Sequence, residues 1–205
     1  MNERPVVLAC GALASELRAV LAGQGLLDAA DVRYLPANLH NRPEGIVPAL
    51  QELLASIDRD RPVLIAYADC GTGGRLDAML ERATAEHPGI TRLPGAHCYE
   101  VFAGADRFAA LHDEEPGTFY LTDFLARHFD ALVWQGLGLD RHPTLRDQYF
   151  GNYQRLVLLS QSTDTDVVDA GRAAATRLGL AFEHHHVGRG ALADAVTLTI
   201  GRKVA

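Results

Sequence analysis

The chain contains three cysteines, and each stands beside a glycine or in a polar turn rather than inside an apolar run. Cys10 follows VVLA and precedes a glycine, Cys70 follows VLIAYAD and precedes a glycine, and Cys98 lies in GAHCYE. Three thiolates that converge on one point repel one another unless a metal ion or cluster holds them. We therefore expect Cys10, Cys70 and Cys98 to bind one metal centre.

Two kinds of metal centre suit three thiolates. A [4Fe–4S] cluster held by three cysteines leaves one iron open to a substrate, and a zinc ion with three protein ligands keeps an open fourth position. Either would act as a Lewis acid, and we favour the cluster over zinc. His97 could complete a Cys3His zinc site, but adjacent residues rarely both reach one ion. The alternative is that the thiols pack as small hydrophobic side chains.

The predicted strands give the cysteines a common location. If strands near 5–9 and 62–67 are parallel neighbours, Cys10 and Cys70 lie at the same edge of the sheet, each at the start of a helix. The helix dipole there is expected to lower the pKa of a thiol. Cys98 could approach the same crevice, so the three sulfur atoms should lie within about 7 Å of one another.

The segment DCGTGG resembles a phosphate-binding turn, because consecutive glycines expose backbone N–H groups at the start of a helix. Candidate cofactor-binding residues are Gly71, Thr72 and Gly73, with Gly11 in the matching turn after the first strand. The segment lacks the Lys-Ser/Thr ending of a P-loop and the full spacing of a dinucleotide fingerprint. A tight strand-to-helix turn is the simpler interpretation.

A polar stretch in the second half of the chain carries further side chains capable of chemistry. Asp140 and His142 could form an orienting acid and a proton-transfer pair, and Arg146 could receive a substrate carboxylate. Together with His97 they form the candidate catalytic set. The alternative is a polar helix face without a catalytic role.

Apolar runs of strand length alternate with stretches of helical period, which is typical of βαβ units around a mainly parallel sheet. Strands are expected near 5–9, 32–35, 62–67, 117–121, 155–160 and 181–186, with a weaker one near 131–134. Helices are expected near 13–21, 46–57 and 76–83, and from Asp164 or Asp166 to Leu178, closed by Gly179.

The predicted fold is an α/β, Rossmann-like open sheet with helices on both faces. We expect a single domain over residues 1–205, which could consist of two pseudo-repeated halves at about 1–115 and 116–205. With 48% hydrophobic residues the chain can bury a sizeable core.

Charge and composition narrow the class of protein. The net charge of −7, without a basic stripe, argues against nucleic acid as the main partner. No apolar run approaches the roughly 20 residues that a membrane helix needs, and the start MNERPVVLACG has no signal-peptide layout. We expect a cytoplasmic protein that does not act at a membrane. In that reducing compartment three cysteines do not indicate a disulfide framework.

These residues together resemble a family of uncharacterised bacterial and archaeal proteins that is defined by a domain of unknown function. The resemblance extends along nearly the whole chain and rests on ACGALASEL, LPANLHNRPEGI, YADCGTGG, RLPGAHCYEVFAG, EEPGTFYLTDF, GLDRHPTLRDQYFGNY and LGL. Genes of this family often lie near those of corrinoid-dependent methyltransferases. The resemblance implies methylated-amine or one-carbon metabolism and a corrinoid or methyltransferase partner protein. The chain lacks the DxHxxG sequence of a base-off corrinoid module, which weighs against direct corrinoid binding.

The leading hypothesis is a metal-dependent enzyme, a lyase or transferase, or a metallocentre protein whose three-cysteine centre acts on a small-molecule substrate. One alternative is a non-catalytic accessory protein of a methyltransferase system. The other is a metal-free enzyme that uses a nucleotide at DCGTGG.

Overall fold

The computed structural model describes residues 4–200, apart from the side chains at positions 191 and 199. Its paired strands are parallel and form two sheets, one of four strands and one of three. Helices flank both sheets, so the predicted α/β class with parallel strands is confirmed. The contacts divide the chain into two compact units, Met1–Val101 with Arg189–Ala205, and Phe102–Gly188.

The first unit contains the four-stranded sheet, whose strand order is β2-β1-β3-β4. Its strands are β1 (Val6–Cys10), β2 (Asp31–Leu35), β3 (Val63–Ala66) and β4 (Ile90–Arg92). The central strands β1 and β3 read VVLAC and VLIA, and every residue in both is buried. Continuous apolar runs of this kind are expected where helices cover both faces of a parallel sheet.

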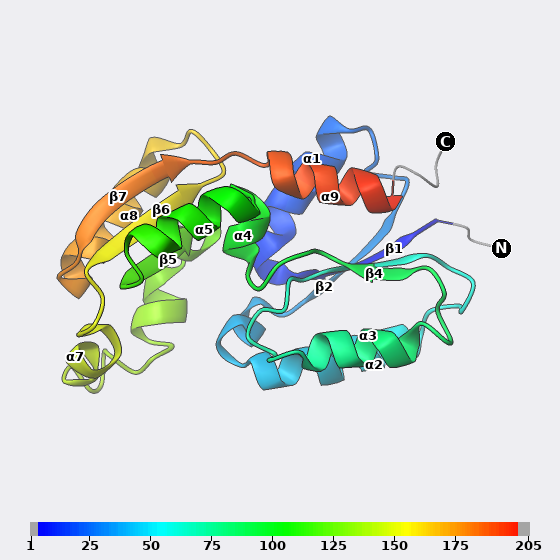
Figure 1. The fold of residues 1–205 in the computed structure, drawn as a ribbon, viewed down its shortest axis with the longest axis horizontal. Helices are drawn as coiled ribbons and strands as arrows, with labels where there is room; N and C mark the ends of the chain where they lie inside the picture. The colour runs from blue at the N-terminus through cyan, green and yellow to red at the C-terminus, as the bar shows by residue number, and fades with distance from the viewer. Residues whose placement is uncertain (1–3, 201–205) are drawn as a thin grey trace. The chain divides into compact units, whose positions relative to one another are not determined.

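The helices of the first unit cover both faces of its sheet (Figure 1), with α1 and α9 on one face and α2 and α3 on the other. Their bounds are α1 (Ala14–Gly23), α2 (Ile46–Leu54), α3 (Arg75–Ala83) and α9 (Gly190–Ile200), and α4 (Cys98–Ala103) begins in this unit. Short 3₁₀-helices occupy Gly11–Leu13, Ala37–Asn41 and Pro43–Gly45. Helix α9 follows the second unit in the sequence but belongs to the first unit.

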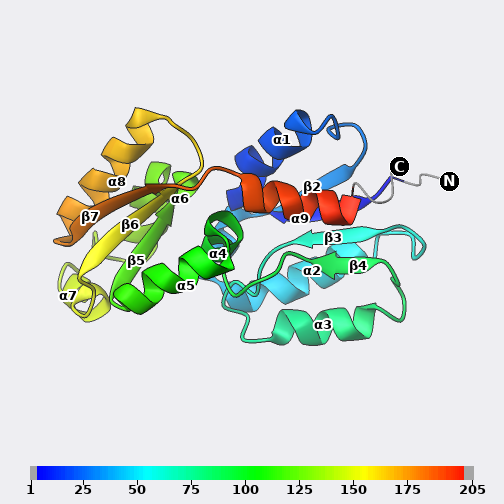
Figure 2. The same ribbon diagram turned by 45° about the horizontal axis from the view of Figure 1, so that its top comes forward.

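The second unit contains the three-stranded sheet, in the order β5-β6-β7. Its elements are α5 (Ala105–Glu114), β5 (Thr118–Thr122), α6 (Asp123–Arg127), α7 (Leu145–Phe150), β6 (Arg155–Ser160), α8 (Thr165–Leu178) and β7 (Ala181–His186). Helices α6 and α8 pack together on one face of this sheet, and α5 covers the other (Figure 2). The predicted halves at about 1–115 and 116–205 separate the two sheets, whereas the compact units place α5 in the second unit and α9 in the first.

Both ends of helix α8 confirm the predicted capping residues. The Asp164 carboxylate accepts a hydrogen bond from the backbone N–H of Asp166 at 3.0 Å. Gly179 follows the helix with a φ of 74°, the left-handed conformation that glycine adopts without strain.

One predicted strand is wrong, and one strand of the structure was not predicted. The weak strand near 131–134 is a π-helical turn, Asp130–Trp134, which Arg177 fixes by an ion pair with Asp130 and by stacking 3.7 Å from the Trp134 ring centre. Strand β4 was not predicted, because three residues are too few to show a periodic pattern.

Strand β1 lies between β2 and β3, so the chain passes from β1 to β2 on one side and then returns to β3 on the other side. The predicted pairing of β1 with β3 is confirmed, with Val6 opposite Val63 and Ala9 opposite Ala66. In open parallel sheets, the crevice outside the carboxyl ends of two such strands is the usual ligand site. Cys10 ends β1 and Cys70 follows β3 at this position.

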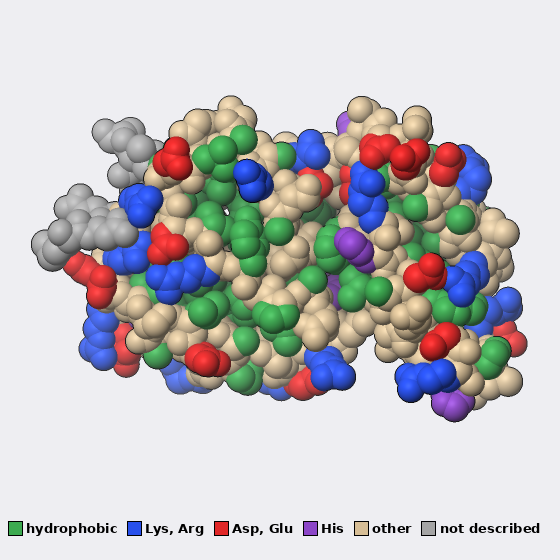
Figure 3. Space-filling view, turned by 180° about the vertical axis from the view of Figure 1, so that it is seen from behind, with side chains coloured by type: hydrophobic (Ala, Val, Ile, Leu, Met, Phe, Trp, Pro, Cys, Tyr) green, Lys and Arg blue, Asp and Glu red, His purple; other side chains and the backbone are tan. Residues whose placement is uncertain are grey.

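The surface agrees with the charge pattern of the sequence. On the face shown in Figure 3, basic and acidic side chains are interspersed and do not gather by sign. Within residues 4–200, every helix is too short or too polar to cross a bilayer.

Candidate functional site

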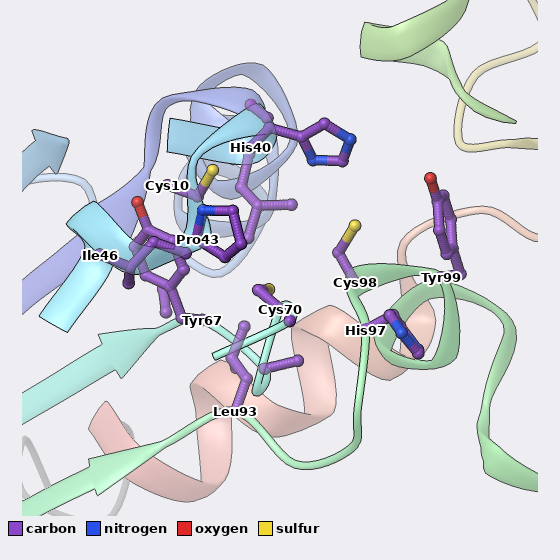
Figure 4. Close-up of a pocket in the computed structure, with 15 residues that line it drawn as sticks. Cys10, His40, Pro43, Ile46, Tyr67, Cys70, Leu93, His97, Cys98 and Tyr99 are labelled. Atoms are coloured by element: carbon purple, nitrogen blue, oxygen red, sulfur yellow. The ribbon is translucent and has the colours of Figure 1, made fainter. Parts of the chain in front are cut away.

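A pocket of about 280 Å³ lies at the carboxyl edge of the first sheet, and Cys10, Cys70 and Cys98 all line it (Figure 4). All three are free thiols. Apolar side chains form most of the remaining wall, and the polar groups on it come from four aromatic residues, His40, Tyr67, His97 and Tyr99. The structure thus brings together the three cysteines that the sequence assigned to one site.

Cys10 reaches the pocket from the end of β1. The backbone N–H groups of Ala12 and Leu13 are directed at its sulfur, because the chain turns there into a short 3₁₀-helix. A Cβ atom on the intervening Gly11 would lie 2.7 Å from the Leu35 carbonyl oxygen. Glycine is therefore required for the close approach of two backbone segments, and this packing explains Gly11 without a cofactor.

Cys70 has an unusual backbone conformation. Its φ is +50°, and among residues 4–200 it is the only non-glycine residue with a positive φ. Its N–H donates a hydrogen bond to the Ala96 carbonyl at 2.8 Å, and the N–H of Asp69 donates to Gly95 at 3.1 Å. Residues held in sparsely populated backbone regions concentrate at functional sites, where the surrounding structure imposes the strain.

Cys98 is the first residue of α4. It directly follows the loop whose carbonyl groups accept hydrogen bonds from Asp69 and Cys70. The Glu100 carboxylate accepts a hydrogen bond from the Ala96 N–H at 2.9 Å and so fixes the start of this helix. The backbone N–H of Cys98 is directed at the Cys70 sulfur. Two of the three cysteine-bearing segments are therefore joined by backbone hydrogen bonds next to the sulfur atoms.

The thiols are not activated by the helix starts, contrary to the sequence prediction. Burial raises the pKa of Cys10, and the backbone N–H groups directed at its sulfur lower that pKa by less. Burial and, after it, a charge on Cys10 raise the pKa of Cys70 to about 12. The pKa of Cys98 is raised first by burial and then by charges on Cys70 and Cys10. Desolvation raises the three thiol pKa values by more than the N–H groups lower them. Without a metal, the three thiols are therefore neutral near pH 7.

The donor set fits a thiolate-bound metal centre. Thiolates are the ligands of iron–sulfur clusters and of many zinc sites, and backbone N–H groups directed at ligand sulfurs are typical of clusters. As the side chains of residues 4–200 stand, no three cysteine, histidine, aspartate or glutamate side chains are grouped to hold a single ion. Rotation about each Cα–Cβ bond moves a cysteine sulfur without a change in the backbone.

Comparison with protein-family models matches residues 34–196 to a family described as protein of unknown function, DUF1638. The chain belongs to the DUF1638 family. The match includes Cys70 and Cys98, while Cys10 precedes the matched residues. A search of the curated proteins found no match to the chain. The expected membership of a domain-of-unknown-function family is confirmed.

Two pocket residues of this DUF1638 protein were not singled out from its sequence. Tyr67 is 1% exposed and follows β3, where it reads as one more apolar residue of the strand. His40 lies at the rim in the irregular loop LPANLHNRPEG, and burial of its ring lowers its pKa although part of the residue is exposed. The irregular loop was the available signal for His40, because loops at strand ends build such sites.

The DCGTGG turn of the DUF1638 protein has its own internal anion. The Asp69 carboxylate accepts hydrogen bonds from the Thr72 hydroxyl at 2.5 Å and from the Gly73 and Gly74 N–H groups at 3.0 Å each. Burial opposes ionisation of Asp69, but these hydrogen bonds hold its pKa below the ordinary value. A phosphate would have to displace this carboxylate, so the geometry favours a strand-to-helix turn over a phosphate site at Gly71, Thr72 and Gly73.

Replacing Asp69 by asparagine is expected to lower the free energy of unfolding by about 1–3 kcal/mol, because an amide cannot accept all three hydrogen bonds. The ionised carboxylate stabilises the fold above the ordinary aspartate pKa, so the deficit of Asp69→Asn should shrink as the pH falls below about 4. Urea denaturation at pH 7 and pH 3.5 tests this. The exposed Asp60 supplies the control, Asp60→Asn, and an equal change in both variants would contradict the expectation.

The predicted catalytic residues lie in different places. His97 lines the pocket, but its ring and the Cys98 sulfur leave the loop in opposite directions (Figure 4). Asp140, His142 and Arg146 belong to the second unit, are exposed, and do not line the pocket. Arg146 pairs there with Asp147 at 2.9 Å. A catalytic role of these three residues stays a prediction.

Proposed function

We propose that this DUF1638 protein is a metal-dependent enzyme or a metallocentre protein. Cys10, Cys70 and Cys98 would hold an iron–sulfur cluster, and a small molecule would bind beside it in the pocket. The observation that supports this most is the convergence of every cysteine in the chain, from three separate segments, on one largely apolar pocket. Free thiols persist in a reducing compartment, which supports a cytoplasmic location.

A cluster and a zinc ion hold three thiolate ligands at different spacings. A Zn–S bond of about 2.3 Å brings the sulfur ligands of one ion to roughly 4 Å from one another. The ligands of a cluster bind separate iron atoms and stand farther apart. We favour the cluster, and the metal content of the purified protein distinguishes iron from zinc.

The pocket residues would bind the substrate and move protons. A cluster with three protein ligands supplies an open Lewis-acidic iron when it is bound. The His40 imidazole, which its lowered pKa keeps neutral near pH 7, is placed to accept a proton from a bound molecule. The side chains of Leu13, Ile46 and Leu93 exclude water, which strengthens electrostatic interactions inside the pocket.

Anaerobic purification followed by iron, sulfide and zinc analysis tests the proposal. We expect about four irons per chain with matching sulfide and broad visible absorbance. Cys98→Ala should lose most of this metal, because it removes one of three ligands. His97→Ala is the matched control, since the neighbouring ring is directed away from the sulfurs, and it should keep the metal. A colourless wild-type protein without iron or zinc would contradict the proposal.

The same preparation separates this function from a non-catalytic role in a methyltransferase system. A metal-free protein that copurifies with a methyltransferase would support the accessory role instead. Equal loss of metal in His97→Ala and Cys98→Ala, with zinc in place of iron, would indicate a closed Cys3His site.

A further inference from the structure

Tyr67 is a buried side chain of the pocket whose polar group has no evident role in folding. It follows β3, its exposed fraction is 1%, and its ring extends from the end of the strand toward Cys10 (Figure 4). The polar group that its hydroxyl faces is the Cys10 thiol. Phenylalanine would fill the same volume without burying a hydroxyl.

Within residues 4–200 the Tyr67 hydroxyl has no oxygen or nitrogen partner, and the acceptor beside it is the Cys10 sulfur. Buried polar atoms are almost always hydrogen-bonded, and each exception calls for an explanation such as a missing ion or a functional role. A neutral thiol is a weak acceptor, so Cys10 leaves the hydroxyl unsatisfied while it keeps its proton. A thiolate accepts a much stronger, charge-assisted hydrogen bond.

Metal binding changes this pair. When a metal binds Cys10, the thiol proton leaves to solvent and the sulfur becomes a thiolate ligand. We infer that Tyr67 is a positioning residue of the three-cysteine centre, whose hydroxyl donates to the Cys10 sulfur a hydrogen bond that becomes strong when a metal binds there. This inference rests on the proposed function.

The hydrogen bond has two consequences for the centre. It holds the Cys10 sulfur in one orientation, as partners of metal ligands commonly do. It also withdraws electron density from the sulfur, which favours the reduced form of a cluster and raises its reduction potential. Neither effect requires Tyr67 to contact a substrate.

Tyr67→Phe tests the inference in the full chain, with and without metal. Without metal, the variant should melt at or above the wild-type temperature, because an unsatisfied buried hydroxyl is removed. With metal, a chelator should remove the metal at least about tenfold faster than from the wild type. The reduction potential of an iron–sulfur cluster should become more negative. Tyr120→Phe is the control, because Tyr120 is also buried but belongs to β5 in the second unit.

The outcomes separate this inference from the proposed function. If the wild type holds metal and Tyr67→Phe matches it in metal release and potential, the role of Tyr67 is overturned and the metal centre stands. If metal-free Tyr67→Phe melts below the wild type, its hydroxyl is already satisfied and the inference fails on that ground alone. A wild-type protein that takes up neither iron nor zinc overturns both.

Discussion

Cys70→Gly is expected to abolish metal binding while changing the free energy of unfolding by no more than about 1 kcal/mol. The variant removes one of three metal ligands, and a centre with two thiolates from the chain should not survive purification. The backbone explains why the fold survives. At a φ of +50° glycine has no steric penalty, whereas other residues carry about 1–2 kcal/mol there. This relief offsets the lost packing of the thiol and the greater freedom of glycine in the unfolded chain.

Cys70→Ala separates the ligand from the backbone. It also removes the sulfur, so it should lose the metal equally, but it keeps a Cβ atom at a positive φ and should be less stable than Cys70→Gly by about 1 kcal/mol. Urea denaturation of the metal-free proteins and metal analysis of the anaerobic preparations give both results. Retention of metal by Cys70→Gly would show that this cysteine is not a ligand. A glycine variant less stable than the alanine variant would show that the strain is not relieved.

The meeting of the cysteines was predictable from sequence for a physical reason. Central strands of a covered parallel sheet are buried on both faces, so β1 and β3 read as unbroken apolar runs that end next to Cys10 and Cys70. Parallel strands put such ends at one edge, and β1 and β3 do pair in parallel. The third cysteine, Cys98, could be expected only to approach this edge, because its position depends on hydrogen bonds from Asp69 and Cys70 to the following loop.

The electrostatics of the site could not be obtained in the same way. The sequence indicates that helices begin near Cys10 and Cys70, which favours lowered thiol pKa values. It does not show how far the surrounding loops remove water from the two sulfur atoms, and this burial raises both pKa values. The positive φ of Cys70 is equally a tertiary effect, since hydrogen bonds to residues 95 and 96 impose it.

Strand prediction did not reveal that the strands form two sheets. Periodicity identifies a strand from its own residues, whereas its partners depend on packing between distant segments. The short strand β4 closes the first sheet beside β3, and three residues gave no signal for that edge. The Asp69 turn did carry a local signal, because an aspartate shortly before two glycines can accept their N–H groups, and the phosphate interpretation did not use it.

Asp123→Ala is expected to lower the free energy of unfolding by about 3 kcal/mol. Asp123 is 3% exposed at the carboxyl end of β5, and its two oxygens accept hydrogen bonds from the backbone N–H groups of Gln161 and Ser162, at 2.9 Å each. The N–H of Asp123 donates to the Gln161 side-chain oxygen at 3.0 Å. Alanine leaves two buried N–H groups without an acceptor, and each costs about 1–3 kcal/mol.

Asp123 also shows how a structural carboxylate differs from a catalytic one at the same kind of position. The carboxyl end of a parallel strand is where catalytic residues are usually found, but both oxygens of Asp123 are engaged in joining β5 to the segment after β6. Asp123→Asn keeps one acceptor oxygen and should lose less stability than Asp123→Ala. Asp140 is an exposed carboxylate, so Asp140→Ala should stay within about 0.5 kcal/mol of the wild type. Urea denaturation of the three variants tests this order. If Asp123→Ala were as stable as Asp140→Ala, the carboxylate would be available for a role other than holding the two segments together.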